Sequence, residues 1–237
     1  MKKIIVLILT VALCMSALTS CKVINKVLNK GEPETTPLDE VASMYNMSAP
    51  TKITAVTKQT ISATTLTCEY ELVTGAVDGK AASVYTVKTQ EFNTVENGGA
   101  TDIVKPLINE TIKKTEAIEG VGSRVNGSEW NPEGTIWIIG RGAMGLNLDN
   151  DSVTNVTYEN HVLTFTVPKA NASVVLGEAY SKNIDSDVSV TIVDDGAVVT
   201  AINLSYLLAG DEAAKLPQSE MKIEVVYTYD IEKITIS

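Results

Sequence analysis

The sequence predicts an α+β domain built on a mainly antiparallel sheet with two or three short helices. Apolar and polar residues alternate in about eight segments, which is the pattern of half-buried strands. Most of these segments are joined by short turns, and helical spacing is confined to a few short stretches. Because strands joined by short turns pair antiparallel, we expect one such sheet, with helices covering its apolar face.

The N-terminus has the three parts of an export signal. Lys2-Lys3 is followed by the apolar run 4–13 and then by small residues. The signal ends in Leu18-Thr19-Ser20-Cys21, which resembles the lipobox of bacterial lipoproteins. The resemblance implies that Cys21 receives acyl chains, palmitate among them, and becomes the new N-terminus. The alternative is an ordinary signal peptide with a chance cysteine.

We therefore expect three parts: a lipoprotein signal peptide (1–20), a tether (21–37) and a single α+β domain (38–237). The tether is either a short amphipathic helix on the membrane surface or a plain flexible linker. Two or more acyl chains would hold the protein stably on the extracytoplasmic face of the cell membrane.

Charge and cysteine content exclude several classes of function. Loss of residues 1–20 removes Lys2 and Lys3, which leaves 17 basic against 29 acidic residues and a net charge near −12. Nucleic-acid binding is therefore not expected. Cys14 leaves with the signal and Cys21 carries lipid, so Cys68 alone can form neither an intramolecular disulfide nor a cysteine zinc site.

The first half of the domain is predicted to contain a helix, a hairpin and a second helix. Thr36-Pro37-Leu38-Asp39 predicts a helix start, because Thr caps, Pro suits the first turn and an acid favours the N-terminal dipole. Strands are expected over 51–65, 66–72 and 81–92, with a turn at 75–79. Helical spacing continues over 103–115, and 120–134 is expected to be a loop.

The second half is predicted to be mostly strand. Expected strands are 135–139, 153–158, 162–167, 188–193, 198–208 and 221–229. Glu159-Asn160-His161 and Asp194-Asp195-Gly196 are the expected hairpin turns. Residues 168–176 are predicted to form a short helix ended by Gly177.

Gly140, Gly142 and Gly145 match the G-x-G-x-x-G pattern of dinucleotide-binding turns. That site needs a helix starting at the third glycine, because the helix N-terminus holds the pyrophosphate. The following residues, Leu-Asn-Leu-Asp-Asn-Asp-Ser, are poor helix formers. We therefore expect a structural role for the glycines and no cofactor.

Four other candidate sites favour structural interpretations. Asp149-Asn150-Asp151 lacks the later ligands of a calcium loop. Glu69 and Glu71 share one strand face, as a carboxylate pair would, but the solvent face of a half-buried strand is the better interpretation. His161 is expected at a surface turn and Cys68 in the core. We predict no metal site and no catalytic residue, and hence no enzyme.

The segment 187–237 contains DVSVTIVDDGAVVTAINLSYLL and, after a polar loop, EMKIEVVYTYDIEKITIS. This strand meander resembles the closing strands of carrier-like bacterial lipoproteins, a group similar to the periplasmic lipoprotein carrier and the mycobacterial glycolipid-carrying lipoproteins. The resemblance implies a strongly curved sheet that wraps over helices and can enclose an apolar cavity for acyl chains. Residues 94–150 do not match this pattern so easily.

The expected function is non-catalytic binding of an apolar or amphipathic ligand, such as a lipid. The alternative is a structural or protein-interaction module of the envelope, whose partner the sequence does not identify. If a ligand binds, six alternating residues of three strands are expected to line its site: Val190, Ile192, Ile202, Leu204, Ile223 and Val225.

Overall fold

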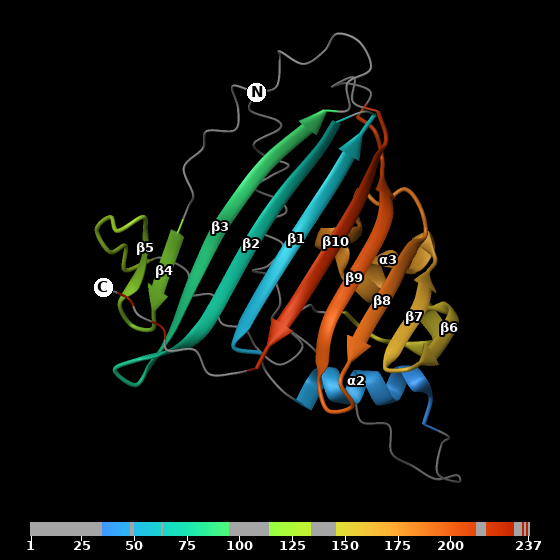
Figure 1. Cartoon of the computed structure of the whole chain (residues 1–237), viewed down its shortest axis with the longest axis horizontal. Coiled ribbons are helices and arrows are strands. Elements are labelled where there is room, and N and C mark those ends of the chain that lie inside the picture. Colours follow the sequence, from blue (N-terminus) through green and yellow to red (C-terminus); the bar gives the residue numbers. More distant parts are fainter. Residues whose placement is uncertain are drawn as a thin grey trace.

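The computed structural model describes residues 35–47, 50–62, 64–94, 114–133, 146–211, 217–229, 234 and 236. Ten strands in these ranges form one sheet in the order β5-β4-β3-β2-β1-β10-β9-β8-β7-β6 (Figure 1). Each neighbouring pair is antiparallel, which confirms the predicted α+β class. The strands are β1 Lys52–Ile61, β2 Thr64–Val77, β3 Lys80–Thr94, β4 Lys114–Ile118, β5 Gly122–Val125, β6 Thr154–Glu159, β7 Val162–Val167, β8 Val188–Asp194, β9 Val199–Leu208 and β10 Ser219–Thr228.

The first and last strands meet in the centre of the sheet. β1 pairs with β10 from Lys52 opposite Thr228 to Thr60 opposite Glu220. From this seam, β2 to β5 extend to one edge, and β9 to β6 extend to the other. The sheet is thus two meanders, one from each half of the chain, and the chain passes from one edge to the other between β5 and β6.

Left-handed turn residues fix the hairpins. Asp78 and Gly79 join β2 to β3 with φ of 50° and 77°, and Asn160 and His161 join β6 to β7 with φ of 50° and 64°. Two consecutive positive φ values are the mark of the turn that matches the twist of paired strands. The turns fall where the sequence predicts them, although β2 continues to Val77, further than expected.

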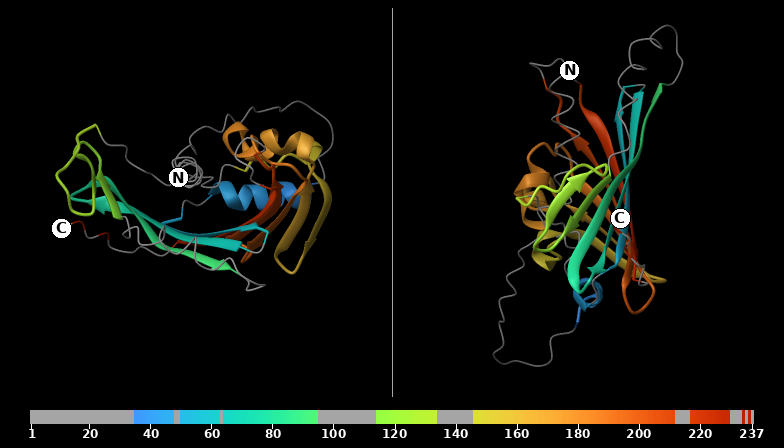
Figure 2. Two further views of the ribbon diagram at one scale, coloured as in Figure 1. Left: turned by 90° about the horizontal axis from the view of Figure 1, so that it is seen from above. Right: turned by 90° about the vertical axis from the view of Figure 1, so that its left-hand side faces the viewer.

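Four helical segments accompany the sheet: α2 Pro37–Met47, η3 Lys169–Asn171, α3 Ala172–Leu176 and α4 Glu178–Ser181; a fifth, η2 Asn150–Ser152, precedes β6. α2 and α3 lie on one side of the sheet, and α2 contacts β6, β7 and β9 (Figure 2). None of the described helices is long and apolar enough to cross a membrane.

The start of α2 is a complete capping box. The Thr36 hydroxyl accepts a hydrogen bond from the Asp39 amide at 3.2 Å, and the Asp39 carboxylate accepts one from the Thr36 amide at 3.1 Å. Leu38 and Val41 are fully buried. This confirms the predicted helix start, and the two buried side chains show that the first turns of α2 pack one face against the core.

Two strands, β4 and β5, replace elements that the sequence predicted otherwise. Thr115, expected at the end of a helix, pairs with Tyr85 of β3, and β5 lies inside the expected loop 120–134. Both strands are too short for alternation to identify them. The expected helix over 103–112, the expected strand 135–139 and Gly140, Gly142 and Gly145 lie outside the described residues.

Candidate functional site

Strand pairing brings the six predicted ligand residues together on one face. Ile192 lies opposite Ile202, which lies opposite Val225, and this forms one row across three strands. Val190, Leu204 and Ile223 form the next row in the same way. The six residues are therefore a block of two rows on the side of the sheet that carries the helices, which we call the inward face.

This block belongs to an aliphatic core. The described core cluster joins it to Leu38 and Val41 of α2 and to Val175 and Leu176 of α3. Five of the six side chains are less than 7% exposed, and Ile223 is partly buried. Helix side chains are thus packed with these residues, which is the arrangement of a filled core.

The inward face of β1, β2 and β3 has a different composition. The same rows continue through Ala55, Tyr70 and Val87, and through Thr57 and Cys68. The Tyr70 and Tyr85 rings are stacked, with centroids 6.2 Å apart and an angle of 11° between their planes. We call this area the tyrosine half, because hydroxyl, thiol and aromatic groups lie here among aliphatic side chains such as Ile53 and Leu72.

Burial governs the titration of this area. It raises the pKa of the Cys68 thiol, although hydrogen bonds with Tyr70 and Thr57 act in the opposite direction. Burial also raises the pKa of both Tyr70 and Tyr85 above the usual range of tyrosine. The groups are therefore uncharged at neutral pH, and Cys68 is a buried thiol, as the sequence predicts.

A row of short side chains runs beside the tyrosine half. Thr74, Ser83, Ala117 and Ser123 lie opposite one another across β2, β3, β4 and β5. Ser83 is 1% exposed, and its hydroxyl has no hydrogen-bond partner in the described part of the chain. A buried hydroxyl without a partner is unfavourable, so this position needs an explanation.

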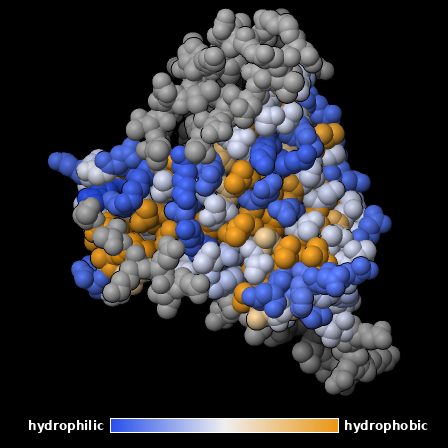
Figure 3. Space-filling model, viewed as in Figure 1, coloured by the Kyte–Doolittle hydropathy of each residue, from blue (hydrophilic) through white to orange (hydrophobic). Residues whose placement is uncertain are grey.

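The opposite, outward face carries the charged residues of these strands. Lys88 lies 2.7 Å from Glu71 and 3.9 Å from Glu69, and Lys52 lies 3.0 Å from Glu71. Burial alone would raise the pKa of Glu71, but the two ammonium groups outweigh it and hold the pKa below its usual value. The predicted Glu69 and Glu71 pair is thus part of an ion-pair network on a face of mixed hydropathy (Figure 3).

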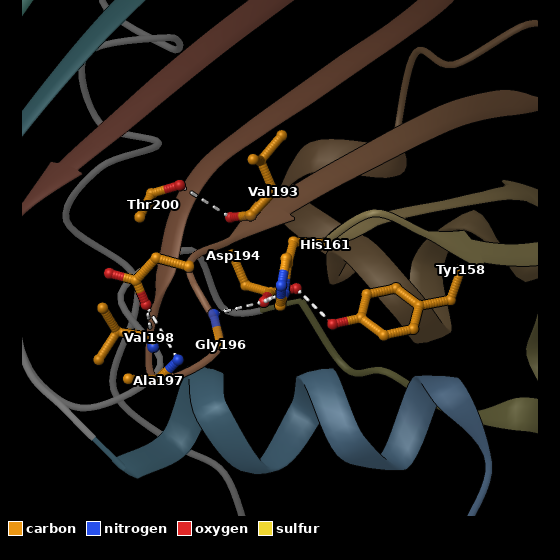
Figure 4. A network of polar contacts seen from close by, with 9 residues as sticks. Tyr158, His161, Val193, Asp194, Gly196, Ala197, Val198 and Thr200 are labelled. Carbon is orange, nitrogen blue, oxygen red and sulfur yellow. Dashed lines mark hydrogen bonds and ion pairs between the residues drawn. The ribbon is translucent and has the colours of Figure 1, made fainter.

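A second polar cluster lies at the β6–β7 edge, where His161 and Tyr158 converge on Asp194 (Figure 4). The Asp194 side chain is fully buried. Its Oδ2 accepts a hydrogen bond from the Tyr158 hydroxyl at 2.9 Å. Its Oδ1 accepts one from the Gly196 amide at 2.8 Å and lies 2.9 Å from Nδ1 of His161. Because an ionised Asp194 can only accept, Nδ1 of His161 carries a proton and donates it.

This His-Asp pair connects two hairpin turns. The His161 side chain is 59% exposed, which agrees with a surface turn residue. The described residues contain no group of three or more His, Cys, Asp or Glu that could hold a metal ion. Asp194 was missed from the sequence, although it continues the inward-facing series Val188, Val190 and Ile192, where a carboxylate needs partners.

The Asp149 carboxylate, in the loop that was considered as a calcium site, makes hydrogen bonds within its own turn. It accepts hydrogen bonds from the Asp151 amide at 3.3 Å and from the Ser152 hydroxyl at 2.8 Å, so it caps η2. Asn150 contacts the cap of α2 through Asp39 at 3.3 Å. The acidic loop therefore connects η2 to the start of α2.

The fold places this protein in the α+β class, with one antiparallel sheet that carries its helices on one side. No family model and no curated protein matches the sequence. Among solved structures, LprF from Mycobacterium bovis is similar at 9% identity and a TM-score of 0.36, over 84% of this chain and 94% of that chain. A DUF1329 family protein from Desulfovibrio piger is similar at 9% identity and a TM-score of 0.28, over 83% and 93% of the two chains. Scores this low carry no inference about function.

Proposed function

We propose that the protein is a membrane-anchored lipoprotein of the extracytoplasmic face whose strongly curved sheet binds an apolar or amphipathic ligand without catalysis. The signal sequence and Cys21 support the anchor. The observation that carries the ligand is a change in composition along the inward face. The aliphatic half is the six-residue block of β8 to β10, which packs with α2 and α3, whereas the tyrosine half adds hydroxyl, thiol and stacked aromatic groups within the same core.

The ligand is expected on the tyrosine half. Proteins bind small amphipathic molecules in mainly apolar sites with a few placed polar groups, and aromatic rings with hydroxyls meet this requirement. Ile223 and Val225 of β10 border this half, because they lie opposite Thr57 and Ala55 of β1. In this proposal they contact the ligand. The other four predicted residues pack with α2 and α3 instead: Val190, Ile192, Ile202 and Leu204.

Native mass spectrometry of the mature chain with Cys21→Ser, purified from cells, tests the ligand. We expect a lipid to remain bound, and fluorescent fatty acyl probes to bind saturably. If no lipid co-purifies and no acyl probe binds, the carrier function is wrong. The structural or protein-interaction module is then the better interpretation, and the filled packing around Ile192 and Ile202 favours it.

The anchor is tested separately in a bacterium that processes lipoproteins. The wild-type chain should partition into the detergent phase and show an N-terminal mass increase for acylation at Cys21. The Cys21→Ser variant should remain in the aqueous phase. Equal partitioning of the two chains, with no lipid mass on the wild type, would show that Cys21 is not an anchor.

A further inference from the structure

We infer that the ligand of the tyrosine half presents an uncharged polar group, a hydroxyl, ester or amide, to the Ser83 hydroxyl. This inference rests on the proposed function and specifies the ligand class. The matching molecules are neutral amphipathic lipids such as monoacylglycerols, as distinct from ionised fatty acids.

The first support is the small size of the side chains around Ser83 on the inward face. The row of Thr74, Ser83, Ala117 and Ser123 lies beside the row that contains Leu72 and Tyr85, roughly 7 Å away along the strands. Ser83 and Ala117 are nevertheless buried, at 1% and 0% exposure, so any group that meets the Ser83 hydroxyl is enclosed there. In this inference the polar group of the ligand lies against these short side chains, and its acyl chain follows the aromatic rings.

The second support is the Ser83 hydroxyl itself. It is buried and has no hydrogen-bond partner among the described residues. A hydroxyl can both donate and accept, so it matches a ligand carbonyl and a ligand hydroxyl equally well. Contact with either group would remove the penalty of leaving the hydroxyl unpaired.

The third support is the distribution of charge. Within β1 to β4, the described Lys, Arg, Asp and Glu side chains lie on the outward face, and the inward positions are uncharged. Burying an ionised headgroup against neutral side chains costs far more than burying a neutral one that makes a hydrogen bond. The same chemistry therefore favours a neutral ligand over an anionic one.

The test compares two fluorescent probes of equal acyl length, a monoacylglycerol and a fatty acid, at pH 8 on the mature chain with Cys21→Ser. We expect the monoacylglycerol to bind at least about tenfold more tightly than the ionised fatty acid. Ser83→Ala should weaken monoacylglycerol binding about five- to tenfold and leave fatty acid binding unchanged. The matched control is Ser189→Ala, at an exposed position of β8.

The outcomes separate this inference from the proposed function. If neither probe binds to the wild type, the proposed function itself is wrong. If both probes bind and Ser83→Ala changes neither affinity, only the Ser83 assignment is overturned, and the hydroxyl is satisfied by the chain itself. Ser83→Cys, which keeps the size of the side chain, replaces the alanine variant if thermal unfolding shows that the latter is misfolded.

Discussion

Nδ1 of His161 lies 2.9 Å from Oδ1 of Asp194, and the Asp194 amide donates a hydrogen bond to the His161 carbonyl at 3.0 Å. The two residues therefore contact each other through both side chain and backbone. His161 belongs to the β6–β7 turn, and Asp194 ends β8 just before the β8–β9 turn. The pair fastens the outermost hairpin to the core of the sheet, above α2 (Figure 4).

Replacing Asp194 should be among the most destabilising polar substitutions in the described part of the domain. Asp194→Ala removes the acceptor of Tyr158, His161 and Gly196 at once, and we expect a loss of about 3 kcal/mol in the free energy of unfolding. Urea denaturation followed by circular dichroism measures this loss. Asp195→Ala is the matched control, because Asp195 is exposed and its carboxylate accepts hydrogen bonds from the turn amides of Ala197 and Val198. Equal losses for the two variants would contradict a special role for Asp194.

The alkaline titration of Tyr158 should report the same cluster. Desolvation by burial, together with the hydrogen bond to the negatively charged Asp194, raises the pKa of Tyr158 to about 12. Because the folded pKa exceeds the unfolded value of about 10, this stabilisation is fully present below pH 10. It is lost as the pH rises from about 10 towards 12.

The measurement is the absorbance of ionised tyrosine in the wild type and in Tyr158→Phe. The difference between the two titrations should be a single step with a midpoint near pH 12. Asp194→Asn should move this step to lower pH, because it removes the neighbouring negative charge. A difference step centred near pH 10 in the wild type would show that Tyr158 is not held by Asp194.

The sequence predicts those elements whose signals are local. The capping box at Thr36 and Asp39, the Asp78-Gly79 turn and the alternation along β8, β9 and β10 each depend on residues close in the chain. The pairing of β1 with β10 depends on residues more than 150 positions apart, and no local pattern encodes it. β4 and β5 were not predicted, because strands of only five and four residues carry little pattern of their own and are stabilised by their neighbours in the sheet.

The candidate site shows the same limit. Alternation placed Val190, Ile192, Ile202, Leu204, Ile223 and Val225 on one face, and strand register confirms that they adjoin. Ser83 and Tyr85 also alternate with their neighbours, but their relation to Thr74, Ala117 and Tyr70 exists only through pairing across strands. The grouping of these side chains depends on the register between strands, so the sequence alone did not predict it.

Cys68 should be unreactive in the folded protein. Its side chain is buried, and burial raises the pKa of its thiol, so little thiolate forms at pH 8. In the mature chain with Cys21→Ser, Cys68 is the only thiol. We expect a coloured disulfide reagent to leave most of the folded protein unlabelled over an hour and to label it at once in guanidinium. Rapid stoichiometric labelling without denaturant would show that the tyrosine half is open to solvent.

Leu204→Trp distinguishes a filled core from a ligand cavity at the aliphatic half. Leu204 is 6% exposed and lies between Val190 and Ile223, and it shares a core cluster with residues of α2 and α3. If helix side chains fill this space, the larger indole must displace them, and the free energy of unfolding should fall by about 1–3 kcal/mol. Val226→Trp is the control, because Val226 is 52% exposed on the outward face of β10 and should tolerate the indole.

Thermal unfolding and acyl-probe binding are measured for both variants. We expect Leu204→Trp to lower stability, while the acyl probe still binds to the tyrosine half. Unchanged stability with lost probe binding would instead place the acyl chain directly on Leu204 and move the ligand site under the helices.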